Sequence, residues 1–359
     1  MHKLTTQYYM FDSPLNSILQ FRIGNNIRVL FILALVLLGS ACAPMIHKPG
    51  SLMQQPSLED RSYITADGII LPVHRWQSDS TAHSVIIALH GFNDYGHFFN
   101  DAGEFLAERG IISYAYDQRG FGDTEKPGLW AGVDAYLDDL QTFVRLVQQQ
   151  HADLPVYLLG ESMGGAVVLA ASSRAGFPDV AGLILSAPAV WGRAVMPWYH
   201  RWLLAVSAHT VPHMHVTGSG LKIIPSDNTD MLRELWKDPL VIKKTRIDAV
   251  YGVVNLMDTA LQASADITVP VCLLYGERDQ IIPANAVSTM LESIRSPELV
   301  RTALYANGYH MLLRDLEAET VWTDIANWII QPDHPFPSGA EDIASARLFK
   351  NRLYSSATE

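Results

Sequence analysis

Cysteine is scarce in this sequence, since only Cys42 and Cys272 occur among 359 residues. Cys272 lies in the apolar run 271–275 and is expected to be a small buried residue, whereas Cys42 follows an apolar stretch near the N-terminus. A disulfide bond between them is not expected, because one is predicted in a buried strand and the other in a leader segment.

Clustered positive charge is also missing. The net charge is −11, and the acidic residues are spread along the chain. A nucleic-acid surface needs clustered Lys and Arg, so nucleic acid is excluded as a partner. The sequence has no Gly-rich phosphate loop with its Lys, and His209, His213 and His215 lack further ligands at metal spacing. No metal and no other cofactor is therefore expected.

The N-terminal region has a short apolar run, Val29–Leu38. Its ten residues are too few to span a membrane comfortably but suit the core of a signal peptide. The run leads to Gly39-Ser40-Ala41-Cys42, which resembles the lipobox of bacterial lipoproteins. We expect residues 1–42 to be a signal peptide and lipobox, with Cys42 lipidated and the protein anchored to a membrane of the bacterial cell envelope. Ala43 favours the outer membrane; an ordinary cleaved signal or an uncleaved anchor is the alternative.

The remaining chain divides into a tether, a domain and a tail. Residues 43–60 are rich in Pro and polar residues and are interpreted as a tether. Residues 61–332 alternate strand and helix patterns, which predicts an α/β domain with a mostly parallel sheet and helices on both faces. About 189–268 is a Trp-rich interruption without a clear strand pair, interpreted as a helical cap above the carboxyl edge of the sheet. Residues 333–359 form a polar C-terminal tail.

The expected elements of the domain follow from apolar runs and helical periodicity. The predicted strands are 62–65, 69–76, 84–89, 111–116, 156–159, 183–187, 271–275 and 302–305. The predicted helices are 98–109, 133–150, 284–293 and 318–330.

A serine motif follows the predicted strand Val156–Leu159. The chain continues as Gly160-Glu161-Ser162-Met163-Gly164, a G-x-S-x-G pentapeptide, and helix-forming residues come next. On such a turn the serine hydroxyl projects away from the backbone, at the positive end of the following helix dipole. Ser162 is therefore the candidate nucleophile, and the alternative is a buried serine in an ordinary loop.

A serine hydroxyl needs a base within hydrogen-bond reach, and that base must be held by a third group. His310 lies in a Gly-containing loop after the last predicted strand and is the candidate base. Asp279 follows the strand 271–275 and is the candidate acid, with Glu277 as the alternative. Asp279 could instead be a solvated turn residue, and a lone His is more often structural.

The negative oxygen of a tetrahedral intermediate needs backbone N–H donors. Met163 follows the candidate nucleophile, and Phe92 lies in the loop after strand 84–89, so these two are the candidate donors. His90, in the same loop, is a candidate substrate-binding residue, although a structural hydrogen bond is favoured. Asp117 and Arg119 are interpreted as a buried ion pair that shapes the next loop.

Together these motifs resemble the α/β-hydrolases. The resemblance rests on His90-Gly-Phe92, Asp117-x-Arg119-Gly-x-Gly122, Gly160-Glu-Ser162-Met-Gly-Gly165, Gly276-Glu-Arg-Asp279 and Gly308-Tyr-His310. Within the α/β-hydrolases, the motifs resemble the monoacylglycerol lipase and lysophospholipase branch, which is also grouped with the serine aminopeptidases. It covers about residues 60–330 and implies an α/β-hydrolase fold with a catalytic Ser162, Asp279 and His310.

The resemblance implies hydrolysis of a carboxylic ester, and the apolar cap favours an acyl-ester lipid with one chain. Trp198 and Trp202 are candidate substrate-binding residues, although they could equally belong to the core of the cap. A serine aminopeptidase is an alternative, with Asp227, Asp230 and Glu234 as weak candidates for holding an α-amine. A non-catalytic envelope binding protein on the same scaffold is the third possibility.

Overall fold

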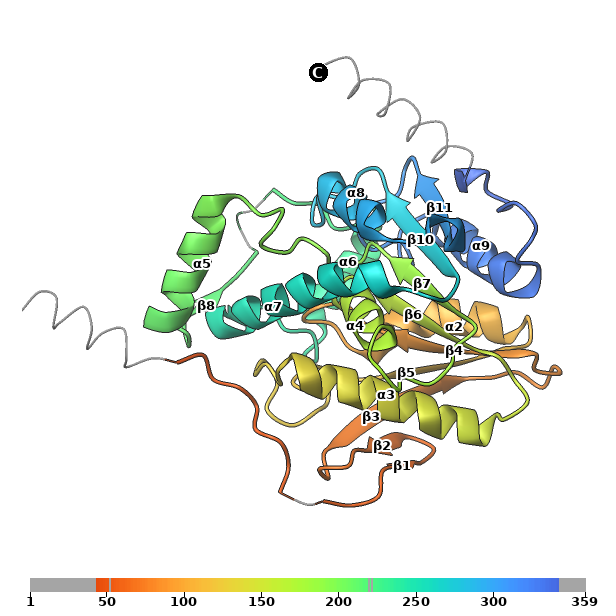
Figure 1. The fold of residues 1–359 in the computed structure, drawn as a ribbon, viewed down its shortest axis with the longest axis horizontal. Coiled ribbons are helices and arrows are strands. Elements are labelled where there is room, and N and C mark those ends of the chain that lie inside the picture. Colours follow the sequence, from red (N-terminus) through yellow and green to blue (C-terminus); the bar gives the residue numbers. More distant parts are fainter. Residues whose placement is uncertain (1–42, 52, 219, 221, 342–359) are drawn as a thin grey trace, which may run out of the picture.

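The structure is a computed structural model that describes residues 43–341 apart from 52, 219 and 221 (Figure 1). Its described part contains a nine-stranded sheet in the order β1-β2-β3-β5-β4-β6-β7-β10-β11. The strands β4 to β7, β10 and β11 are parallel, and β1, β2 and β3 form an antiparallel edge. The strands are β1 (Ser57–Leu58), β2 (Ser62–Ile64), β3 (Ile70–Trp76), β4 (Ser84–Leu89), β5 (Ile111–Tyr116), β6 (Val156–Glu161), β7 (Gly182–Ser186), β10 (Val271–Gly276) and β11 (Val300–Tyr305).

Helices cover both faces of this sheet (Figure 1). All residues of β4, β5, β7 and β10 are buried, as expected for strands of a parallel sheet enclosed on both sides. One core packs under α3, α4, α7 and α8, and the other packs under α2 and α9. The helices outside the cap are η1 (Gly96–Phe99), α2 (Asn100–Ala107), α3 (Val133–Gln150), α4 (Met163–Ser172), α8 (Ala284–Ser293), η3 (Pro297–Leu299) and α9 (Ala318–Ile330).

The cap lies between β7 and β10. It contains α5 (Trp198–Thr210), α6 (Thr229–Lys237), α7 (Ile247–Ala263) and the short turn η2 (Ser264–Asp266). A helical cap was predicted, but the expectation that it has no strand pair was wrong: β8 (His215–Val216) pairs with β9 (Thr245–Arg246). Two-residue strands are too short to show an alternating pattern. Helix α5 stands at the edge of the molecule, away from the sheet (Figure 1).

Both ends of the described chain pack onto the domain. Ser57–Leu58 of the predicted tether forms the edge strand β1, and His47 is buried with its N–H bonded to the Trp130 carbonyl. Phe336 and Ala340 of the predicted tail are buried as well. The predicted signal peptide, Cys42 and residues 342–359 lie outside the described residues. Among the helices of the described part, none is both long and apolar enough to cross a membrane.

Candidate active site

Ser162 occupies a strained turn between β6 and α4. Its φ of 53° and ψ of −114° lie outside the regions that most residues adopt, and its N–H donates to the Ser186 carbonyl at 2.9 Å. A Cβ at Gly164 would lie 2.1 Å from the Leu89 carbonyl oxygen, and one at Gly160 would lie 2.4 Å from the backbone of Gly164. Both glycines are therefore required by this turn, as the pentapeptide predicts.

His310 and Asp279 meet in the loops after β11 and β10. His310 Nδ1 lies 2.8 Å from Asp279 Oδ2, and both side chains are buried. The other oxygen of Asp279 accepts the N–H groups of Ile281 and Ile282 at 2.7 and 3.0 Å. Because a carboxylate accepts from Nδ1–H, the neutral ring presents Nε2 as an acceptor. The residue that contacts His310 is thus Asp279 and not the alternative Glu277.

The loop after β4 lies against the serine turn. A Cβ at Gly91 would lie 3.4 Å from the Ser162 Cβ. The backbone of this loop therefore approaches the serine turn closely at the residue before Phe92. Met163 is the first residue of α4, and the N–H groups of a first helical turn have no acceptor within the helix. Both candidate oxyanion donors therefore lie in the segments that flank Ser162.

His90 is fully buried beneath this loop. Its Nε2 accepts the Gln118 N–H at 2.9 Å, so its Nδ1 donates to the Gly91 carbonyl at 2.8 Å. Burial lowers the pKa of His90, which keeps the ring neutral. Both ring nitrogens are engaged by the backbone, which places His90 in a structural role and out of reach of a substrate.

The expected ion pair between Asp117 and Arg119 is wrong. Arg119 binds Asp67 and Asp139 through bonds of 2.6–2.7 Å. Asp117 instead accepts the N–H groups of Gly96 and Asp123 and lies 3.4 Å from His74 Nε2. Both residues are buried and shape loops; Asp123 lies in the same loop as Asp117, whereas the other partners are distant in sequence and adjacent only in the fold.

Arg314 is a site residue that the sequence analysis missed. Its Nη2 lies 2.6 Å from Asp94 Oδ2 and 3.0 Å from Glu161 Oε1; both carboxylates are buried, and the Arg314 side chain is 10% exposed. Burial raises the pKa of Glu161. Arg314 thereby joins the loop of His310 to the residue before Ser162 and to the loop of Phe92. The available signal was Glu161 itself, because a charged residue at the end of a buried strand needs a partner.

An apolar cavity of about 640 Å³ opens beside Phe92. Helices α5 and α7 of the cap and the segment after Asp279 form its walls, and His200 and Ser207 are its polar side chains. Trp198 and Trp202 do not line it: they are 68% and 69% exposed on the outer side of α5, so they are neither cavity lining nor cap core. The lining residues are Phe92, Trp191, Met196, His200, Leu203, Leu204, Ser207, Val216, Ile247, Val250, Val253, Val254, Met257, Ile281 and Ile282.

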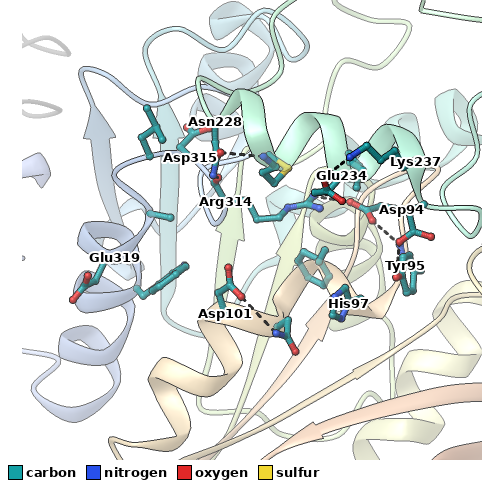
Figure 2. A pocket seen from close by; sticks show the side chains of 18 of the residues that line it. Asp94, Tyr95, His97, Asp101, Asn228, Glu234, Lys237, Arg314, Asp315 and Glu319 are labelled. Atoms are coloured by element: carbon teal, nitrogen blue, oxygen red, sulfur yellow. Dashed lines mark hydrogen bonds and ion pairs between the residues drawn. The ribbon is translucent and has the colours of Figure 1, made fainter.

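A second, polar cavity of about 740 Å³ is lined by Asp94 and Tyr95 of the loop after β4 (Figure 2). Acidic and basic side chains line it between α6, α2 and α9, among them Asp94, Glu234 and Arg314. Glu234 pairs with Lys237 at 2.7 Å, and Asp227 accepts the Leu316 N–H at 2.9 Å. Asp230 pairs with Arg233. Within the described residues, no group of His, Cys, Asp and Glu side chains could hold a metal ion.

The parallel sheet, the serine turn and the cap after β7 define an α/β-hydrolase. Residues 80–317 match the family described as serine aminopeptidase, S33, and the chain belongs to that family.

Relatives and solved structures agree with this assignment. A monoacylglycerol lipase of Mycolicibacterium smegmatis is 24% identical over 77% of this chain and 99% of its own. A human monoglyceride lipase is 25% identical over 75% and 89%. The crystal structure of a Paleococcus ferrophilus monoacylglycerol lipase has a TM-score of 0.60 at 22% identity, covering 72% of this chain and 98% of that one. The last comparison bears on the fold alone.

Proposed function

We propose that this protein is a serine carboxylic-ester hydrolase. The observation that carries the proposal is the 2.8 Å contact of His310 Nδ1 with Asp279 Oδ2, at the sheet edge where the Ser162 turn lies. A buried carboxylate on one side of an imidazole orients the ring and leaves its other nitrogen to act as a base. Relatives named monoacylglycerol lipase support a hydrolase that acts on esters.

In the proposed reaction, His310 Nε2 takes the hydroxyl proton of Ser162 while the serine oxygen attacks the ester carbonyl. The N–H groups of Phe92 and Met163 receive the negative oxygen. His310 then protonates the leaving alcohol oxygen, the ester C–O bond breaks, and the acyl group remains on Ser162. A water molecule attacks this acyl-enzyme and gives a proton to His310; His310 returns a proton to the Ser162 oxygen as the acyl C–O bond breaks, and the carboxylic acid leaves. Asp279 stabilises the imidazolium in both halves of the reaction.

We propose a monoacylglycerol or a lysophospholipid as the substrate. The cavity beside Phe92 has a volume of about 640 Å³ and an almost wholly apolar lining, which suits one acyl chain. The names of the relatives point to the same class of lipid. The acyl chain of the bound ester would lie between α5 and α7, with the ester carbonyl at the Ser162 turn.

A serine aminopeptidase is the second candidate, since the family carries that description. Such an enzyme would need carboxylates to hold an α-amine. Asp230 and Glu234 are paired with Arg233 and Lys237, and neither they nor Asp227 line the apolar cavity. These pairings and the absence of a carboxylate from the described cavity lining therefore favour an esterase over an aminopeptidase.

Two measurements test the proposal. A fluorophosphonate probe should label the wild-type protein but not Ser162→Ala, and a folded wild type that stays unlabelled would make it a binding protein instead. Turnover of p-nitrophenyl acyl esters should then exceed that of an aminoacyl-anilide. The opposite preference would assign the peptidase activity, and a panel of lipids with different head groups would identify the substrate.

We also propose that Cys42 carries the lipid anchor of an envelope protein, in the outer membrane. The support is the sequence alone, in the small residues before Cys42 and the apolar run Val29–Leu38. Labelled fatty acid should be incorporated into the wild type and not into Cys42→Ser. Acyl label on the variant, or none on the wild type, would overturn the proposal.

A further inference from the structure

The chain before β1 is bonded to the domain at several points. We call residues 45–50 the N-terminal strap. The Met45 N–H donates to Asp248 Oδ2 of α7 at 3.2 Å, and the Gly50 N–H donates to Asp67 Oδ2 in the turn between β2 and β3 at 2.9 Å. Figure 1 shows this segment passing along the outside of the domain between the cap and β1. The strap lies outside residues 80–317, which match the family, so it is a feature of this chain beyond the matched domain.

His47 lies in the middle of the strap. Its side chain is buried, and its backbone N–H donates to the Trp130 carbonyl at 2.8 Å. Both ring nitrogens are buried, and neither has a hydrogen-bond partner among the described residues. The polar link between the strap and the domain at this point is therefore the backbone bond to Trp130, while the imidazole contributes through packing.

Trp130 joins the strap to the cap and to the loop of the oxyanion donor Phe92. Its side chain is buried, and a Cβ at Gly252 of α7 would overlap its ring. The centroids of the Trp130 and Phe92 rings are 6.3 Å apart at an interplanar angle of 63°, an edge-to-face arrangement that aromatic pairs favour. A single side chain thus packs against the cap helix and against Phe92, and its carbonyl binds the strap.

The position of Phe92 depends on these aromatic contacts. Its ring packs on Phe121 as well, at 5.6 Å, and Phe121 and Trp130 both belong to the segment 117–132 between β5 and α3. The next residue, Asn93, has a φ of 69° in the left-handed region, and its side-chain amide donates to Thr245 Oγ1 at 2.7 Å. The cap therefore fixes the residue after Phe92, and the aromatic segment fixes Phe92 itself.

We propose that the N-terminal strap positions the oxyanion donor Phe92 through Trp130, so that His47 and Trp130 are positioning residues. The inference rests on the proposed ester hydrolysis and deepens it, because it adds a segment outside the matched family domain to the same site. Trp130 does not line the apolar cavity. Loosening the strap should therefore weaken binding of the tetrahedral oxyanion and leave binding of the acyl chain unchanged.

Two pairs of variants of the full chain test the proposal. His47→Pro removes the N–H that donates to the Trp130 carbonyl, and Lys48→Pro places the same ring at the next, exposed position. Trp130→Leu removes the ring contact with Phe92, and Trp130→Phe keeps an aromatic ring there. Thermal unfolding shows whether each variant is folded.

Three quantities are measured for each variant. The first is the kcat and KM for a p-nitrophenyl acyl ester. The second is the inhibition constant of an alkyl trifluoromethyl ketone, whose adduct with Ser162 places a negative oxygen at the oxyanion donors. The third is the dissociation constant of palmitic acid, which probes the apolar cavity without forming a tetrahedral adduct.

His47→Pro should lower kcat at least ~5-fold and Trp130→Leu at least ~10-fold, because a displaced donor loses part of its effect on the transition state. The inhibition constant of the ketone should rise by the same factor as kcat/KM falls. KM and the dissociation constant of palmitic acid should stay within ~3-fold, since the cavity lining is intact. Lys48→Pro should stay within ~2-fold of the wild-type kcat, and Trp130→Phe within ~3-fold.

An unchanged kcat in folded His47→Pro and Trp130→Leu, with an active wild type, would overturn the positioning role and leave the proposed function standing. Losses confined to KM and palmitic acid binding would overturn it too, because they would place Trp130 in the shape of the cavity. If Trp130→Leu does not fold, the pair His47→Pro and Lys48→Pro decides by the same criteria. A wild type with no ester turnover would overturn the proposed function and this inference together.

Discussion

Arg314 Nη2 lies 3.0 Å from Glu161 Oε1, so the fourth residue after His310 contacts the residue before Ser162. The same guanidinium nitrogen lies 2.6 Å from Asp94, in the loop of Phe92. One largely enclosed cation thus connects three loops that the proposed reaction uses. Burial of two carboxylates beside it makes this connection sensitive to substitution, since unpaired buried charges are costly.

Replacing Arg314 with Met should destabilise the protein by about 3–5 kcal/mol, because Glu161 and Asp94 lose their counter-ion. Denaturant unfolding measures this, and adding Glu161→Gln should restore at least half of the loss. The concentration of intact active sites can be measured by titration with a fluorophosphonate. If Arg314 positions the loops, kcat calculated per titrated site should also fall at least ~10-fold. An unchanged kcat per titrated site would limit Arg314 to a structural role.

Asp279→Asn should lower kcat by about 10⁴-fold with little loss of folded protein. The carbonyl oxygen of the introduced amide would still accept the hydrogen bonds from the N–H groups of Ile281 and Ile282. The amide NH₂ would then face His310 Nδ1. The ring would then carry its proton on Nε2 and could not accept one from Ser162. Glu277→Gln is the control and should retain activity within ~3-fold. A larger loss in the control than in Asp279→Asn would reverse the assignment of the acid.

Gly164→Ala should destabilise the protein by about 3 kcal/mol or more, since its Cβ would lie 2.1 Å from the Leu89 carbonyl oxygen. Gly218→Ala is the matched control, because no atom lies within 4 Å of a Cβ there. Thermal unfolding of the two variants compares them directly. Equal melting temperatures would contradict the tight packing of α4 against the end of β4.

Asp315 should make stability depend on pH. Burial raises its pKa to about 6 from a usual 3.8, although Ser226 Oγ and the Tyr309 N–H donate to it. A raised carboxyl pKa stabilises the fold below pH ~4, and this contribution is lost as pH rises to about 6. Asp315→Asn should therefore gain up to about 3 kcal/mol relative to wild type between pH 4 and 7. A difference in unfolding free energy that stays constant across this range would disprove the shift.

Leu204 should control the acyl chain length. It lines the cavity from α5, so Leu204→Trp would fill part of the volume. The ratio of kcat/KM for a 16-carbon to a 4-carbon p-nitrophenyl ester should fall at least ~10-fold, since a few methylenes lose their burial. Ala205→Trp, at the next and exposed position, should leave this ratio within ~2-fold. An equal effect at both positions would place the acyl chain elsewhere.

Local patterns in the sequence were sufficient for most of the framework. The helices Val133–Gln150, Ala284–Ser293 and Ala318–Ile330 have the predicted bounds, because periodicity and flanking residues are local signals. The predicted helix 98–109 is split into η1 and α2, a change of hydrogen-bond pattern that apolar periodicity does not encode.

The motif order likewise placed Ser162, Asp279 and His310 in the loops where the structure has them. A G-x-S-x-G turn is specified by its own glycines, and strands that end at one edge of a parallel sheet bring their following loops together. The sequence also favoured Asp279 over Glu277 as the acid, but two acids two residues apart satisfy the same order, and the contact of Asp279 with His310 is seen in the structure.

Contacts between distant segments were decided by tertiary structure alone. Arg119 pairs with Asp67 and Asp139, and Arg314 with Asp94 and Glu161, although a closer acid was available in sequence to Arg119. The exposure of Trp198 and Trp202 was likewise decided by tertiary structure. The sequence shows that one side of a helix is apolar, but whether that side faces the protein or the solvent depends on the neighbouring elements. Sequence determined the strands, helices and motif loops through local sterics and hydrophobic pattern, whereas the fold determined which charges meet and which apolar side faces outward.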